Sequence, residues 1–153
     1  MHLRKRKTQQ SGFTLIEVVI ASVITMILMS AVVPSYMESV RKSRRMEGRA
    51  ALLRLMQQQE RYYSLHNSYI RFSSSSTDED ERKFQWFSGS NAQASAYEIK
   101  AEACANDTIV NCVLLTAMPG TSKVDDKYKD PVCGELSLTS AGVKAANKPD
   151  CWK

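Results

Sequence analysis

The stretch Gly12-Phe13-Thr14-Leu15-Ile16-Glu17-Val18-Val19-Ile20 opens a long apolar run, and the rest of the chain is organised around it. Phe13 to Val33 makes 21 positions, and Glu17 is the single charged residue among them. As a helix that rises about 1.5 Å per residue, this run is roughly 30 Å long, which matches the hydrocarbon core of a bilayer. The sequence therefore predicts a membrane-spanning helix over residues 13–36.

Hydropathy alone leaves two simpler interpretations open, a secretory signal peptide and a plain membrane anchor. The apolar region of a secretory signal usually has about 7–15 residues and ends at a small-x-small cleavage site. This run is longer, and Met29-Ser30-Ala31 matches such a site poorly. A carboxylate inside an apolar span costs about 2.5–3.5 kcal/mol, so Glu17 is a candidate functional residue.

A short basic peptide precedes the apolar run, with Arg4-Lys5-Arg6-Lys7 followed by Gly12. It supplies most of the net charge of +5, because the remaining chain has 17 basic against 16 acidic residues. Net charge therefore gives no argument for nucleic-acid binding. No lysine or arginine follows until Arg41. This asymmetry predicts a cytoplasmic N-terminus and an exported C-terminal domain.

Helix-forming residues continue from Tyr36 to about Leu65, so we expect one helix of about 50 residues. A kink or local melting is expected at Pro34. One amphipathic face recurs at three- and four-residue spacing: Gly48, Leu52, Leu55, Met56, Gln59 and Tyr62-Tyr63. The basic residues between Arg41 and Arg49 predict a solvated collar, or a surface for lipid headgroups and neighbouring subunits.

The C-terminal part predicts a small sheet. Residues 73–81 form a polar insert that is not expected to order itself. Residues 97–103 alternate apolar and charged side chains, as a half-buried strand does. Two further strands are expected at 112–118 and 133–139. An antiparallel sheet packed on the amphipathic half of the helix gives an α+β domain over residues 37–153.

The sequence predicts no enzymatic activity, cofactor or metal site. His66 is the one histidine after the basic peptide, and no Cys-x-x-Cys pair is present. Phosphate-binding glycine loops and nucleophile motifs are also missing from the sequence.

The motif Gly-Phe-Thr-Leu-Ile-Glu at residues 12–17, followed by an apolar run, resembles the type IV pilin signature. The resemblance implies cleavage of a leader, residues 1–12, after Gly12 by a prepilin peptidase. It further implies N-methylation of Phe13 and a role for Glu17 in subunit assembly. The fold it implies is the type IV pilin fold, whose long helix first spans the inner membrane and later packs inside a filament. The implied partners are membrane lipid before assembly, the inner-membrane assembly machinery, and other pilins in a cell-surface pilus.

Residues 41–53, 59–63 and 67–69 are similar to the PilE-type minor pilins, as is the ending from Cys133 to Trp152. This likeness implies a minor type IV pilin that takes part in pilus assembly, a process linked to twitching motility, adhesion and competence. Two alternatives remain, a type II secretion pseudopilin and a DNA-uptake receptor pilin.

Four cysteines after residue 100 suggest two disulfides in an oxidising compartment, and they allow three pairings. Cys104 and Cys112 bracket a loop between two expected strands. Cys133 and Cys151 would tie the third strand to the tail. Pilins generally close a C-terminal loop by a disulfide, and this resemblance adds to the preference for pairing 104–112 with 133–151.

The DNA-uptake alternative needs a basic stripe on the domain. From residue 37 onward there are 17 basic against 15 acidic residues, so a stripe would depend on their arrangement. The lysines that would make it are Lys123, Lys127, Lys129, Lys144 and Lys148. Acidic residues alternate with these lysines along the chain, so we expect negligible DNA binding at physiological ionic strength.

Overall fold

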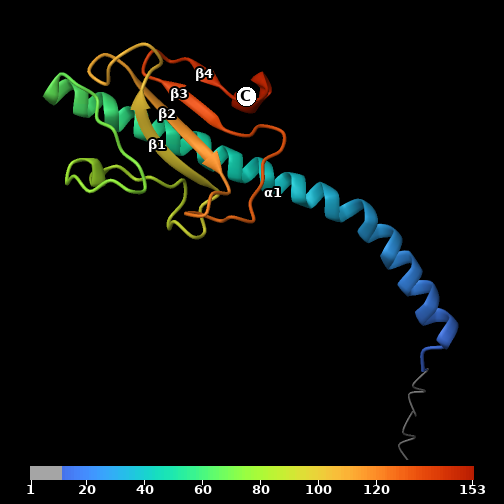
Figure 1. The fold of residues 1–153 in the computed structure, drawn as a ribbon. Helices are drawn as coiled ribbons and strands as arrows, with labels where there is room; N and C mark the ends of the chain where they lie inside the picture. The colour runs from blue at the N-terminus through green and yellow to red at the C-terminus, as the bar shows by residue number, and fades with distance from the viewer. Residues whose placement is uncertain (1–11) are drawn as a thin grey trace, which may run out of the picture. The chain divides into compact units, whose positions relative to one another are not determined.

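The computed structural model describes residues 12–153 (Figure 1). Apart from Gly12, the expected leader lies outside the described residues. The chain divides into two compact units, one that ends at Ser39 and one that spans Val40–Lys153, and each is described by itself. Helix α1 (Leu15–His66) contributes residues to both units.

In the first unit, α1 is apolar on every side. Its large side chains are exposed, from 48% at Val33 to 83% at Leu15. Among the described helices, α1 is the one long and apolar enough to cross a membrane. The helix runs unbroken through Pro34, so the local melting expected there does not occur.

In the second unit, four strands form one antiparallel sheet in the order β1-β2-β3-β4. The strands are β1 (Tyr97–Ala103), β2 (Val113–Pro119), β3 (Leu136–Thr139) and β4 (Lys144–Ala145). Two short 3-10 helices, η1 (Glu81–Lys83) and η2 (Pro149–Trp152), lie outside the sheet. One row of paired residues crosses the whole sheet, from Ala101 through Leu115 and Leu138 to Lys144. The α+β fold predicted from the sequence is confirmed.

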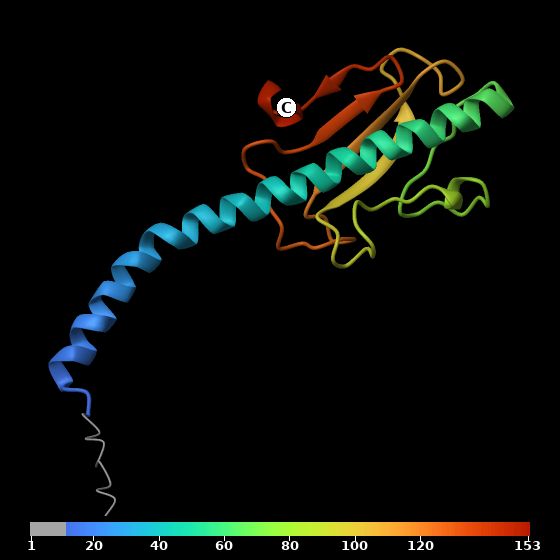
Figure 2. The same ribbon diagram turned by 180° about the vertical axis from the view of Figure 1, so that it is seen from behind.

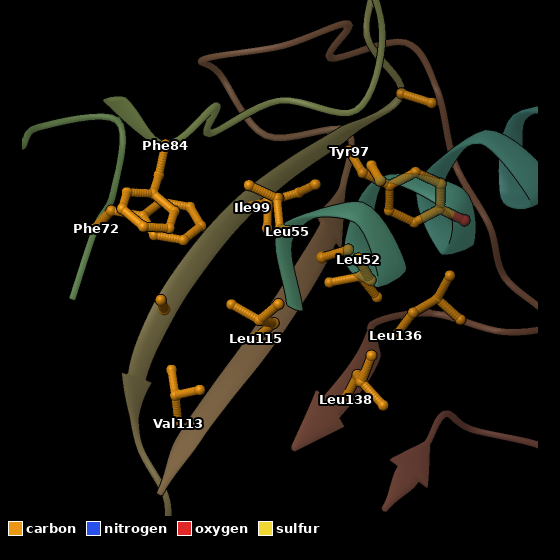
Figure 3. Close-up of a cluster of buried hydrophobic side chains, with 14 of the residues drawn as sticks. Leu52, Leu55, Phe72, Phe84, Tyr97, Ile99, Val113, Leu115, Leu136 and Leu138 are labelled. Atoms are coloured by element: carbon orange, nitrogen blue, oxygen red, sulfur yellow. The ribbon is translucent and has the colours of Figure 1, made fainter. Parts of the chain in front are cut away.

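The second half of α1 crosses one face of this sheet (Figure 2). It packs through the predicted face, where Leu52, Leu55 and Gln59 are fully buried. Figure 3 shows Leu52 and Leu55 among the inward side chains of the strands. A Cβ atom at Gly48 would lie 2.8 Å from Cδ2 of Tyr97, so glycine is required for the Tyr97 ring to approach the helix this closely.

The segment between α1 and β1 is better anchored than the sequence suggested. Gln59 and Ile70 form a reciprocal pair, in which the Ile70 amide donates to Oε1 (3.1 Å) and Nε2 donates to the Ile70 carbonyl (2.7 Å). The buried rings of Phe72 and Phe84 stack with centroids 5.3 Å apart. The Ser74 hydroxyl donates to Glu98 on β1 (2.6 Å). The expectation that residues 73–81 lack order was wrong, because these contacts hold the segment on the sheet.

The structure contains the disulfides Cys104–Cys112 and Cys133–Cys151, the pairing that the sequence favoured. The first closes the β1–β2 hairpin. The second joins the segment before β3 to η2.

A buried ion pair ties α1 to the second disulfide. Nε and Nη2 of Arg45 each lie 2.8 Å from a carboxylate oxygen of Asp130, whose side chain is fully buried. Asp130 also accepts hydrogen bonds from the Tyr97 hydroxyl (3.0 Å) and the Cys133 amide (3.1 Å). One carboxylate therefore connects the helix, β1 and the disulfide-closed tail.

We expect Asp130→Asn to destabilise the second unit in a pH-dependent way. Burial by itself would raise the pKa of Asp130, but the hydrogen bonds from Arg45, the Cys133 amide and Tyr97 outweigh burial and hold this pKa below its ordinary value. A carboxylate of lowered pKa stabilises the fold above the unfolded-state pKa, and this stability is lost as the pH falls through the folded-state pKa. The substitution should lower the free energy of unfolding by about 3–5 kcal/mol at neutral pH, because it leaves the Arg45 charge unpaired.

Denaturant unfolding of the full chain in mild detergent, followed by near-ultraviolet circular dichroism, measures this effect. The difference from the unchanged chain should shrink as the pH falls below about 4. Asp126→Asn, a matched change at an exposed carboxylate of the same loop, should alter stability by less than about 0.5 kcal/mol. Equal stability of the two variants at neutral pH would contradict the role of the ion pair.

Candidate functional site

The first candidate site is the segment that leads into α1. Gly12 and Phe13 precede the helix, which begins at Leu15. The Phe13 side chain is 83% exposed, and no described atom beyond the neighbouring residues lies within 4 Å of a Cβ built on Gly12. The peptide bond between these residues therefore lies in an open, non-helical stretch.

Thr14 and Glu17 form a reciprocal cap at the start of α1. The Glu17 amide donates to Thr14 Oγ1 (3.4 Å), and the Thr14 amide donates to Glu17 Oε2 (3.5 Å). This arrangement satisfies two amides that have no partner within the helix, and the helix dipole favours a carboxylate at this end. This cap was not predicted, although Thr-x-x-Glu before an apolar run is its local signature.

Apolar side chains surround Glu17 along the helix. Ile16, Val18 and Ile20 are each more than half exposed. When lipid or other helices cover this surface, the Glu17 carboxylate loses water and requires a buried partner. The hydrogen bond that this carboxylate accepts from the Thr14 amide supplies no opposite charge. Burial of this part of the helix therefore requires an opposite charge close to Glu17.

The second candidate site comprises the five lysines that a basic stripe would need, and the structure places them in two groups. Lys123, Lys127 and Lys129 are exposed in the loop between β2 and β3. Lys144 lies on β4, with Nζ 5.4 Å from the ring centroid of Trp152. Lys148 directly precedes η2. Among the described residues, no hydrogen bond or ion pair joins the two groups.

One of the acidic residues near these lysines is not available at the surface, because Asp130 is buried and paired with Arg45. Asp150, after Lys148, is exposed and pairs with Lys153. The loop that carries Lys123, Lys127 and Lys129 has three exposed or half-buried carboxylates, Asp125, Asp126 and Glu135, which equal its three lysines in number.

Within residues 12–153, no three His, Cys, Asp or Glu side chains gather in a way that would hold a metal ion. The candidate sites are therefore a helix-end carboxylate and a set of surface cations.

Comparison with known proteins identifies the family. Residues 34–137 match the family model described as type IV minor pilin ComP, DNA uptake sequence receptor. Residues 7–33 match the model of the prokaryotic N-terminal methylation motif. No curated protein matches the chain. Because the minor-pilin model covers more than half of the sequence and the methylation motif directly precedes it, the chain belongs to the type IV minor pilin family.

Proposed function

We propose that this minor pilin uses its apolar helix twice, first as a membrane anchor and then as a packing element inside a pilus. The exposed apolar surface of α1 in the first unit carries this proposal. A helix that is apolar all round has no stable place in water and must be covered by lipid or by other helices. The basic leader supports insertion with the N-terminus in the cytoplasm, from where a prepilin peptidase would cleave after Gly12.

Glu17 would provide the specificity of assembly. After cleavage and N-methylation, the amine of Phe13 carries a positive charge at the start of the helix. We propose that the Glu17 carboxylate pairs with the Phe13 amine of a neighbouring subunit. A subunit in the wrong register would leave a buried charge unpaired, so the pair selects one arrangement as well as stabilising it.

The proposed role is structural rather than enzymatic. Support comes from the family match and from a sequence without a nucleophile or phosphate-binding motif. The partners proposed here are other pilins, the prepilin peptidase and the inner-membrane assembly machinery.

We expect Glu17→Gln to abolish incorporation into filaments while leaving membrane insertion intact. Glutamine keeps the hydrogen-bonding geometry of the helix cap, because Gln serves at this position as Glu does. It removes the charge, which leaves the neighbouring amine without its partner at a cost of about 3 kcal/mol or more. The tagged variant should be at least about tenfold depleted from sheared filaments relative to the membrane fraction, as measured by quantitative immunoblotting.

Thr14→Ala is the matched control. It removes the Oγ1 acceptor of the cap but keeps the Glu17 carboxylate, so incorporation should stay close to normal. If Thr14→Ala were depleted as strongly as Glu17→Gln, the cap and not the charge would be decisive, and the proposed pairing would be wrong.

A second candidate function is DNA binding during uptake, which the description of the matching family favours. The sequence predicts negligible DNA binding because acidic residues alternate with the lysines. The burial of Asp130 weakens that objection, since its charge is already neutralised by Arg45. In this candidate function, the loop with Lys123, Lys127 and Lys129 contacts DNA phosphates.

Filter binding of duplex DNA by the full chain in mild detergent tests this candidate across a range of salt concentrations. Replacing Lys123, Lys127 and Lys129 by Gln should weaken binding and reduce the slope of log K against log salt by up to about 3. A charge-matched control replaces the exposed Arg54, Arg61 and Arg82 by Gln and should leave most of the slope. Absence of binding at physiological ionic strength, or equal slopes for both triple variants, would reject DNA contact by this loop.

A further inference from the structure

The second unit has a basic cavity of about 220 Å³ between α1 and the C-terminal tail. Three cations of α1 line it, Lys42, Arg45 and Arg49, and the tail contributes Asp150 and Lys153. Lys42 and Arg49 lie seven positions apart in α1, two helical turns, so their side chains point from the same side of the helix.

Two of the four cations already face carboxylates. Arg45 forms the buried pair with Asp130, and Lys153 pairs with Asp150 at the surface. Arg49 donates from Nη1 to the backbone oxygens of Cys151 and Lys153, and its other nitrogens donate to no described residue. Among the described residues, the Lys42 ammonium has no hydrogen-bond acceptor and no ion-pair partner. The cavity therefore contains an ammonium and unused guanidinium donors that face no carboxylate side chain.

This donor set suits a phosphate group with a single negative charge. Guanidinium nitrogens bind phosphate oxygens in a fixed planar geometry, and a lysine adds a point charge. Asp150 at the edge would repel a more highly charged anion. Met46, which lines the same cavity and is 58% exposed, offers an apolar contact beside the charges. A phosphodiester with an adjoining apolar portion fits this combination.

The position of these cations in the sequence favours a lipid as the source of the phosphate. Lys42 follows the last residue of the apolar run, Val33, by only nine positions in the same unbroken helix. Residues 8–40 contain no lysine or arginine, whereas residues 41–49 contain five. Basic residues beside a membrane span are attracted to anionic lipid headgroups by about 1 kcal/mol each.

We propose that this cavity binds the headgroup phosphate of an anionic phospholipid while the subunit is in the membrane. Lys42 and Arg49 hold the phosphate, Met46 contacts the apolar part of the lipid, and the tail closed by Cys133–Cys151 forms the far wall. The inference rests on the membrane stage of the proposed function. It adds a defined lipid site that the subunit must leave when it enters a filament.

The experiment uses the full chain in nanodiscs made of equal parts phosphatidylcholine and phosphatidylglycerol. Native mass spectrometry of the released protein counts the lipids of each kind that it retains. The unchanged chain should retain phosphatidylglycerol in preference to phosphatidylcholine, and Lys42→Gln should reduce this preference about fivefold. Arg54→Gln, at an exposed arginine of α1 that does not line the cavity, should leave the preference unchanged.

Competition identifies the source of the phosphate. Inorganic phosphate or duplex DNA, added to the nanodiscs before release, should not reduce the retained phosphatidylglycerol. Displacement by inorganic phosphate would reveal a general phosphate site, and displacement by DNA would make nucleic acid the occupant; either result overturns the lipid assignment. Equal preference in the unchanged chain and Lys42→Gln would also overturn it. A chain that enters nanodiscs without selecting phosphatidylglycerol contradicts this inference alone, whereas a chain that fails to enter them contradicts the membrane role as well.

Discussion

A single carboxylate in an otherwise apolar helix surface is the constraint from which the behaviour of this chain follows. Glu17 caps its own helix through Thr14, an arrangement that satisfies hydrogen bonds but supplies no opposite charge. Water can solvate the carboxylate only while the helix end is exposed. Once lipid or neighbouring helices cover the apolar surface, the charge needs a cation. We propose that the N-terminal amine left by cleavage after Gly12 supplies it.

The second unit is built so that the same helix also organises a folded domain. Past Val40, α1 has one buried face, where Gly48 admits the Tyr97 ring and Leu52 and Leu55 cover the sheet. The pair Arg45–Asp130 then fixes the disulfide-closed tail to the helix. The tail's position completes the basic cavity, so the contact that stabilises the domain also shapes the proposed lipid site.

Local patterns predicted most of this fold, and long-range contacts account for what they missed. The buried face of α1 follows from three- and four-residue spacing, and β1 follows from its alternation of apolar and charged residues. A two-residue strand such as β4 has no period to read, and the order of residues 73–81 depends on Phe72, Phe84 and Glu98, which the sequence alone does not bring together. For the candidate sites, the Thr14–Glu17 cap could be predicted from its spacing. The ion pair between Arg45 and the buried Asp130 could not be predicted, because the two residues are 85 positions apart in the sequence.

The central claim concerns the covalent state of the subunit in an assembled filament, namely its N-terminal residue and its disulfides. Intact-mass spectrometry of the protein recovered from sheared filaments of a strain with a tagged copy measures this state directly. The predicted result is a chain that begins with N-methylated Phe13 and lacks four hydrogens because of its two disulfides. A chain that still begins at Met1, one cleaved after the apolar run, or the absence of the protein from filaments would contradict the account.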